Sequence, residues 1–436
     1  MPFTRTERIM NKEFTVDFGG NGARLRAVYG VCGAPVEPRL FGWDFTEEYK
    51  EMMPRGVRLD ARNAAALSAT EIFLDISCDP ADPTAYDFAE ADRIVLAARE
   101  CGASLLLSLG EYGRRARTLL SRPELLAEIY CGIISHYNEG FAEGCKLGIK
   151  YCELFALEGC FGSAEEHAAL YAQVSSRIKE RFPRLKLGAY SSGGFKSLNN
   201  LDVSDAERGY MSYLESFLSA LSACTTGAAL DFFSWRADVD SPEELALHAN
   251  YAKHYLAQFG FKRCESILTG LTLSDKPTSR ECPSSLASAV ILAQRGNIDA
   301  AYPFSAYPYS PSNSLFTLDD ATDKHEYAAY ETARCLGELF SMKNEVPSSP
   351  DYRREVYLLA ASDKDRAAIL LVTRAFSGTV SIEISGLDAR EYKIKGILGG
   401  GKRGVGYSTE KSGIPITDGK ILLKTGKNEV YFLLLS

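Results

Sequence analysis

The sequence predicts an α/β protein in which a (β/α)8 barrel is followed by a β-sandwich. Short apolar runs alternate with helix-period segments over most of the 436 residues, and from about residue 344 closely spaced strand patterns take over. A chain of this length exceeds the usual size of one domain. We therefore predict N-terminal strands over residues 1–26, a barrel over 27–343 and a sandwich over 344–436, with the N-terminal strands packing against the sandwich.

The barrel prediction rests on eight apolar runs, each short enough for a strand that is buried on both faces. They cover residues 28–31, 56–60, 103–109, 149–157, 185–190, 230–235, 266–273 and 299–304. Between them, residues 88–101 and 165–182 carry apolar side chains at helical spacing, and Pro183 ends the second helix. An open doubly wound sheet would use fewer strands and a glycine-rich phosphate turn near its start, which the sequence lacks.

The C-terminal part reads as strands and turns after a linker at residues 344–350. The predicted strands cover residues 356–360, 367–372, 379–384, 392–397, 420–423 and 429–435. An alternating pattern at residues 14–18 predicts a strand that pairs with this domain. The run from Gly399 to Gly404 matches G-x-G-x-x-G, but residues 405–414 read as a polar loop and not as the helix that a dinucleotide site requires. We interpret the run as a β-turn.

Composition narrows the class of partner. The net charge of −8, with acidic and basic residues interspersed, argues against nucleic acid. No apolar run approaches about 18 residues and no secretion signal is evident, so we expect no membrane insertion and a cytoplasmic protein.

The eleven cysteines are odd in number and form no Cys-x-x-Cys pair, which favours reduced thiols. The five scattered histidines suggest no metal site, and we expect no cofactor. The oligomeric state is left open.

Charged and aromatic side chains stand where the predicted barrel strands end. In such barrels the carboxyl ends of the strands build the active site. The candidates are Arg58, Asp60, Glu111, Glu158, Trp235, Arg236 and Asp275. Each one alone is more often a surface or loop-capping residue than a functional one, so only their joint placement indicates a site.

Three segments resemble glycoside hydrolase family 39, the β-xylosidase and iduronidase group of the clan A barrels. Residues 82–93 resemble the segment from strand two to helix two of that family, residues 135–140 its helix before strand four, and residues 230–235 its strand six. The resemblance extends over nearly the whole chain. It implies a barrel, an extra N-terminal strand layer, a C-terminal β-sandwich and a carbohydrate ligand.

The functional motifs depart from this family. Its strand four carries Trp-Glu-x-Trp-Asn-Glu-Pro, in which the second Glu is the general acid/base, and here that position falls on Leu157. Its strand seven carries Asn-Glu-Trp-Asn with Glu as nucleophile, and here that position falls on Gly270. The family's strand-two arginine is matched by Arg58, and its Ser-Trp-His on strand six by Ser234-Trp235-Arg236.

These departures bear on mechanism. A retaining glycosidase needs two carboxyl groups about 5 to 5.5 Å apart, and neither Leu157 nor Gly270 supplies one. Glu158 is the remaining candidate acid. On a regular strand it would point to the face opposite Leu157, unless Gly159 allows a bulge.

Three hypotheses follow. In the first, the chain is a catalytically degenerate barrel that binds carbohydrate through Trp235 and Tyr302 as stacking platforms and through Arg58, Asp60, Glu111, Arg236 and Asp275 as polar contacts. Arg236 would favour an acidic sugar, or it would pair with Asp60 or Glu111. In the second, the chain is an active glycosidase with relocated carboxylates, Glu158 as acid, and possibly an inverting mechanism, which tolerates a separation of about 6.5 to 9.5 Å. In the third, the cleft is filled and the protein is structural. Turnover of aryl glycosides, or stabilisation by a sugar without turnover, distinguishes them.

Overall fold

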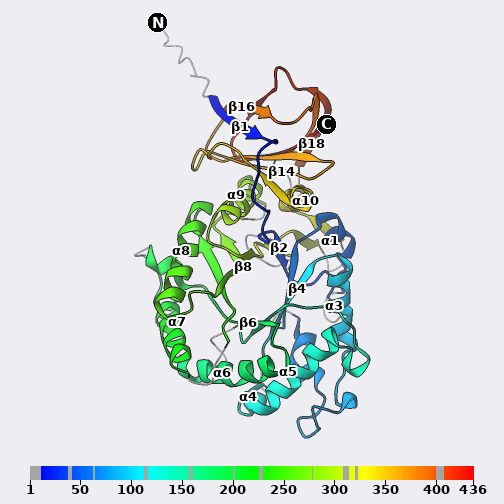
Figure 1. Ribbon diagram of the computed structural model, residues 1–436, viewed down its shortest axis with the longest axis vertical. Helices are drawn as coiled ribbons and strands as arrows, with labels where there is room; N and C mark the ends of the chain where they lie inside the picture. Colours follow the sequence, from blue (N-terminus) through cyan, green and yellow to red (C-terminus); the bar gives the residue numbers. More distant parts are fainter. Residues whose placement is uncertain are drawn as a thin grey trace.

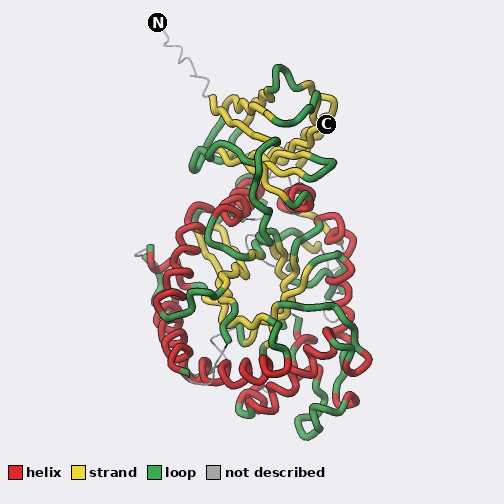
Figure 2. Tube along the Cα trace, viewed as in Figure 1, coloured by secondary structure: helices red, strands yellow, loops and turns green. Residues whose placement is uncertain are grey.

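In the computed structural model of the protein, nine strands form one parallel sheet that curls upon itself, as in TIM-type barrels. The structure describes residues 11–37, 42–61, 64–111, 116–156, 161–199, 202–224, 229–276, 278–307, 314–319, 323–398 and 407–436. The strand order is β10-β2-β3-β4-β5-β6-β7-β8-β9. Figures 1 and 2 show these strands enclosed by a ring of helices, with a second domain to one side.

The strands lie close to the predicted runs. They are β2 (Gly30–Cys32), β3 (Gly56–Asp60), β4 (Ser104–Leu109), β5 (Tyr151–Leu154), β6 (Lys186–Ser192), β7 (Phe232–Val239), β8 (Glu265–Leu273), β9 (Ala300–Ala301) and β10 (Phe304–Ser305). β9 and β10 are the two halves of the eighth predicted strand. The first half pairs with β8 and the second with β2, so this one segment lies between the two edges of the curled sheet.

Helices follow the strands as a covering layer (Figure 1). They are α1 (Thr46–Met52), α2 (Ala69–Ile72), α3 (Ala89–Glu100), α4 (Ala116–Leu120), α5 (Pro123–Asn138), α6 (Ala164–Arg181), α7 (Asp205–Ala223), α8 (Pro242–Gln258), α9 (Cys282–Arg295) and α10 (Ala328–Ser341). The two helices that we predicted individually are confirmed as α3 and α6. Ser163 begins α6 by accepting a hydrogen bond from the Glu166 N–H at 3.2 Å, and the helix ends before Pro183. No described helix combines the length and the apolar content that crossing a bilayer requires.

An apolar plug fills one end of the barrel interior. Leu106, Phe232 and Ile267 come from three different strands and pack together with Tyr302, which lies between β9 and β10. Because side chains alternate along a strand, the residues two positions after Leu106 and Phe232, which are Ser108 and Ser234, face the same interior. This alternation determines which side chains reach the mouth of the barrel.

The C-terminal domain contains two sheets with a shared apolar core. The three-stranded sheet has the order β1-β16-β19 and the six-stranded sheet the order β13-β14-β15-β20-β17-β18. The strands are β1 (Asn11–Asp17), β13 (Asn344–Val346), β14 (Val356–Ser362), β15 (Ala367–Thr373), β16 (Gly378–Ser385), β17 (Glu391–Leu398), β18 (Tyr407–Pro415), β19 (Lys420–Thr425) and β20 (Glu429–Leu435). β11 (Phe316–Asp319) and β12 (Asp323–Glu326) form a separate hairpin before α10. The N-terminal β1 pairs in parallel with β16, so the two ends of the chain share this domain.

Two predictions about this domain were wrong. The linker at residues 344–350 includes β13, which pairs antiparallel with β14. The predicted polar loop at 405–414 contains most of β18, which pairs with β17 at the sheet edge. Residues 408–413 are exposed, and an edge strand with solvent on its faces lacks the apolar signal of a core strand. The glycine run at 399–404 lies outside the described residues.

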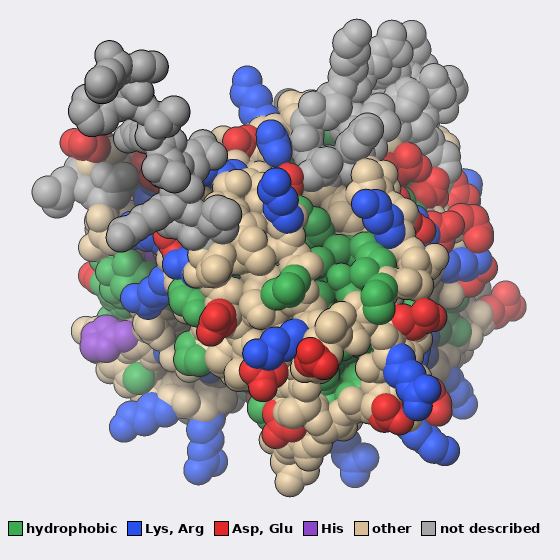
Figure 3. Space-filling view, turned by 90° about the horizontal axis from the view of Figure 1, so that it is seen from above, with side chains coloured by type: hydrophobic (Ala, Val, Ile, Leu, Met, Phe, Trp, Pro, Cys, Tyr) green, Lys and Arg blue, Asp and Glu red, His purple; other side chains and the backbone are tan. Residues whose placement is uncertain are grey.

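The six-stranded sheet also joins the two domains. Along β14, Val356, Leu358 and Ala360 enter the core of the sandwich, whereas Tyr357 and Leu359 pack into the core of the barrel domain. Burial on both faces explains why this strand reads as a continuous apolar run. Figure 3 looks down on the molecule from above Figure 1, and acidic and basic side chains are interspersed over the described part of that face, around a central group of hydrophobic side chains.

Candidate functional site

The strand that carries the predicted acid/base position ends earlier than the sequence suggests. β5 covers Tyr151–Leu154, and the next residue, Phe155, has a left-handed backbone with φ of 56°. Left-handed conformations cost free energy for residues other than glycine and interrupt the two-residue alternation of a strand. The alternation that would orient Leu157 and Glu158 therefore cannot be extended past Phe155. Leu157 and Glu158 themselves lie outside the described residues.

A buried charge cluster occupies the barrel interior above the apolar plug. Asp60, Ser108 and Glu153 are register partners on three neighbouring strands, and Arg58 rises from the layer below them. Arg58 donates from Nη1 to Asp60 Oδ2 at 2.8 Å, and from Nε and Nη2 to Glu153 Oε2 at 3.0 and 2.5 Å. Its Nη2 also donates to Ser108 Oγ at 3.2 Å. One guanidinium thus holds two carboxylates.

Burial sets the electrostatics of this cluster. Arg58, Asp60 and Glu153 are 3%, 2% and 0% exposed. Burial by itself would lower the pKa of Arg58, but the carboxylates of Glu153 and Asp60 outweigh it and keep that pKa well above its usual value. We predicted Arg58 and Asp60 as contacts to a ligand, but all three guanidinium nitrogens of Arg58 donate within the cluster. The Arg58–Asp60 contact is therefore an internal brace.

Glu153 is a member of this cluster that the sequence analysis missed as a site residue. Its partner Arg58 is 95 positions away in the chain. A charged residue within an otherwise apolar strand was the available signal, because a buried charge requires a partner. Its Oε1 is buried and has no hydrogen-bond partner, and the same holds for Ser234 Oγ. Orphaned polar atoms of this kind are uncommon in protein interiors.

The predicted nucleophile position bears no carboxylate, and an arginine adjoins it. Gly270 on β8 is the register partner of Arg236 on β7, after an irregularity in the pairing of these strands. A Cβ atom at Gly270 would lie 3.3 Å from Nε and 3.5 Å from Cγ of Arg236. Arg236 is exposed and lies on the interior side of β7, two positions beyond Ser234. The position of the expected negative charge is therefore next to a positive one.

Glu111 serves as an anchor for the backbone of α2. Its Oε1 accepts from the Ala69 N–H at 2.8 Å and from the Tyr130 hydroxyl at 3.2 Å, and its Oε2 accepts from the Thr70 N–H at 3.1 Å. Burial raises the pKa of Glu111 to about 7, although these hydrogen bonds oppose the rise. We predicted a ligand contact here, and the structure shows a carboxyl group whose two oxygens are both engaged within the fold.

The raised pKa of Glu111 predicts a pH dependence of stability. The folded protein retains this proton up to about pH 7, whereas an unfolded glutamate releases it near pH 4.5. Between these values the folded state binds more protons, so the contribution of Glu111 to stability falls as pH rises, by about 3 kcal/mol in total. In Glu111→Gln this dependence is absent. Denaturant unfolding at pH 5 and pH 8 should show wild type losing stability relative to the variant, and a constant difference between them would contradict the assignment.

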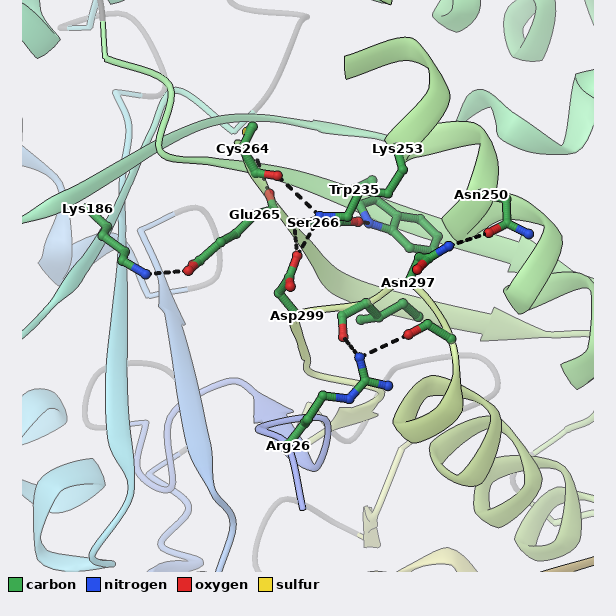
Figure 4. A network of polar contacts seen from close by, with 12 residues as sticks. Arg26, Lys186, Trp235, Asn250, Lys253, Cys264, Glu265, Ser266, Asn297 and Asp299 are labelled. Carbon is green, nitrogen blue, oxygen red and sulfur yellow. Dashed lines mark hydrogen bonds and ion pairs between the residues drawn. The ribbon is translucent and has the colours of Figure 1, made fainter. Parts of the chain in front are cut away.

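Trp235 faces the helices and not the cleft. Phe232 belongs to the interior plug, so the alternation of β7 turns Trp235 to the outer side. Its indole is fully buried, donates to Ser266 Oγ at 2.9 Å and contacts the Phe195 ring edge-on at 5.8 Å. Figure 4 shows the indole beside Ser266 and close to the helix that carries Lys253. The predicted stacking of a sugar on Trp235 is therefore wrong, because the ring has no accessible face.

Two further predicted contacts lie elsewhere. Tyr302 is part of the apolar plug, and its ring lies against Gly30 and Gly56 at the beginnings of their strands, away from the mouth. Asp275 accepts a hydrogen bond from Ser285 and lies 3.9 Å from Nη1 of Arg374, which belongs to the C-terminal domain. It helps to join the domains. Both ligand predictions are corrected by these placements.

The described side chains at this site can bind polar groups, and several of its carboxylates have partners within the fold. The interior carboxylates Asp60 and Glu153 share one guanidinium, Glu111 is engaged by backbone N–H groups, and Gly270 offers no side chain. Across the described ranges, no three His, Cys, Asp or Glu side chains group as a metal site. Arg236 and Asp238 of β7 are exposed, and the alternation of the strand places both on the interior side.

Comparison with solved structures shows that the chain has the fold of the glycoside hydrolases that combine a TIM-type barrel with a β domain. A glucosidase from Croceicoccus marinus is similar with a TM-score of 0.77 and 18% identity, over 98% of this chain and 99% of that chain. A GH51 α-L-arabinofuranosidase from Thermotoga petrophila gives 0.69 and 11%, over 97% and 100%. A β-xylosidase from Caulobacter crescentus gives 0.65 and 14%, over 98% and 99%. No family model and no curated protein matches the sequence. Family 39 membership stays a prediction.

Proposed function

We propose that the protein is a carbohydrate-binding barrel, related to family 39, that does not cleave glycosides by the retaining mechanism. The observation that carries the proposal is the pairing of Gly270 with Arg236. A retaining enzyme places an attacking carboxylate at this position, and the chain has a glycine there, with an arginine within 3.3 Å of where its Cβ would stand.

The remaining carboxylates support the same conclusion. Asp60 and Glu153 are buried and accept hydrogen bonds from one guanidinium, so both carboxylates are engaged within the barrel interior. A nucleophile would also need access to a sugar carbon, and both groups are at most 2% exposed. They stabilise the barrel in this proposal, and Arg236 contacts the ligand.

A sugar is the proposed ligand class. An α-L-arabinofuranosidase from Thermotoga maritima, one of the similar structures, is a complex with arabinose. The exposed guanidinium of Arg236 can donate to hydroxyl or carboxylate oxygens of such a ligand. Acidic sugars would gain a charge-assisted contact there.

The test combines turnover with binding. Aryl β-xyloside and related aryl glycosides should show no turnover above background, while a mono- or oligosaccharide should raise the melting temperature of the protein. Arg236→Ala should weaken that binding about tenfold or more, as expected for a lost hydrogen bond to a charged group. The exposed Arg208, which pairs with Asp205 on α7, provides the control Arg208→Ala, which should bind as wild type does.

Hydrolysis at ordinary enzymatic rates would overturn the proposal. If that hydrolysis were lost in Glu158→Gln, the second hypothesis, a glycosidase with relocated carboxylates, would replace it. An absence of both turnover and sugar binding would favour a structural role.

A further inference from the structure

Two buried polar atoms of the barrel interior have no hydrogen-bond partner within the described part of the chain. They are Oε1 of Glu153 on β5 and Oγ of Ser234 on β7, and both side chains are fully buried. A buried oxygen without a partner costs free energy, and ordered water usually satisfies such atoms in native proteins. The position of the two atoms relative to each other therefore determines whether one water can satisfy both.

The pairing of the strands brings the two residues to the same height in the barrel. Glu153 is the register partner of Gly188 on β6, and Gly188 is the register partner of Phe232 on β7. In a barrel of tilted strands, residues of equal height are staggered by about one position per strand relative to such partners. The plug shows the direction of the stagger, because Leu106 packs with Phe232, which lies further along β7 than the register of Leu106 reaches. The residue level with Glu153 on β7 is therefore Ser234.

The strand between them, β6, turns a large side chain away from the gap. Gly188 has no side chain, and the ring of Phe232 fills the interior space beside it, where a Cβ atom would overlap that ring. Tyr190 is the next residue that the alternation would turn inward. Its backbone is left-handed instead, with φ of 55°, and its ring packs against aromatic rings of α6 and α7. Neither Gly188 nor Tyr190 therefore occupies the space between Glu153 and Ser234.

Charge and burial define what this space can hold. Glu153 accepts from Arg58 through Oε2, so Oε1 still requires a donor, whereas the Ser234 hydroxyl can donate or accept. Arg58 already serves two carboxylates, those of Glu153 and Asp60, which disfavours an anion. Ca²⁺ or Mg²⁺ would require about six oxygen ligands. A sugar cannot reach this depth, because Glu153 and Ser234 are both 0% exposed. Water has the size and the donors that the space requires.

We propose that Glu153 and Ser234 form a binding site for a single internal water molecule in the barrel. The water donates one hydrogen bond to Glu153 Oε1 and forms a second with Ser234 Oγ, which meets the minimum of about two polar partners for a buried water. It links β5 to β7 across β6, whose pairing with β7 is interrupted between Ala189 and Ser192. The proposal does not depend on ligand binding at the barrel mouth.

A crystal structure of the full chain at high resolution tests the site directly. One density peak should lie within about 3 Å of both Glu153 Oε1 and Ser234 Oγ. A direct hydrogen bond between the two side chains, or a lack of density between them, would overturn the proposal. Crystals grown in a rubidium salt distinguish water from a monovalent cation. An anomalous signal at the peak would identify a cation and overturn the proposal, and a peak without that signal supports water.

Urea unfolding provides an independent test in solution. Ser234→Ala leaves the water with one partner, so the urea midpoint should fall below that of the wild type. The matched control is Ser288 on α9, a fully buried serine whose hydroxyl also has no partner in the described chain but which lies in the helix layer. Ser288→Ala removes an unsatisfied hydroxyl, so its midpoint should not fall. An equal or higher midpoint in Ser234→Ala would show that its hydroxyl is unsatisfied too, and would overturn the proposal.

Discussion

Replacing Arg58 by methionine should destabilise the protein by about 3–5 kcal/mol, because it leaves two buried carboxylates without their partner. Asp60 and Glu153 are almost completely inaccessible to water, and every nitrogen of the Arg58 guanidinium donates to a neighbour in the cluster. Methionine preserves much of the volume, so the loss reports mainly on charge. Urea unfolding of wild type and variant at pH 7 measures it.

A compensating variant distinguishes the loss of the charge partner from the loss of packing. The triple variant that combines Arg58→Met with Asp60→Leu and Glu153→Leu should regain much of the loss, because it removes the two unpaired charges as well. Arg208→Met breaks the exposed pair with Asp205 and should cost less than about 1 kcal/mol. A loss of stability in Arg58→Met as small as that in Arg208→Met would show that Arg58 does not stabilise the two buried carboxylates.

The fold was predictable where burial determines the residue pattern. The core strands of the barrel are apolar runs because helices cover one face and interior side chains the other, and seven of the eight runs became single strands of the curled sheet. β18 was missed because it is an exposed edge strand whose pairing with β17 leaves no apolar pattern in the sequence. The early end of β5 was missed as well, because the left-handed Phe155 depends on its tertiary surroundings and not on its residue type.

The site was harder to predict, because a residue's position at the end of a strand does not fix the direction in which its side chain points. Trp235 and Arg236 are neighbours in sequence, yet one faces the helices and the other the interior side. The two-residue alternation from Phe232 could have separated them, had the inward residue been known. Glu111, Asp275 and Glu153 show a second limit. Their partners are the backbone of α2, Arg374 and Arg58, and only the folded chain brings these together.

The second large effect is expected at Gly337 of α10, which packs against the backbone of Met52 at the end of α1. A Cβ atom at this position would lie 1.8 Å from the carbonyl oxygen of Met52 and 2.7 Å from its carbonyl carbon. The Tyr29 hydroxyl lies 2.9 Å from the same Met52 oxygen and 2.7 Å from the Ala333 oxygen of α10. The end of α1 is therefore held between α10 and Tyr29. Gly337→Ala should therefore displace α1 and cost about 1–3 kcal/mol or more by denaturant unfolding, although alanine favours helices.

A second helical glycine is the control for this prediction, because the same substitution there should change stability in the opposite direction. Gly209 lies within α7, and a Cβ there would meet no atom within 4 Å. Gly209→Ala should stabilise the protein by about 0.5–1 kcal/mol through helix propensity alone. Equal effects of the two substitutions would show that close packing of α1 on α10 is not what Gly337 provides.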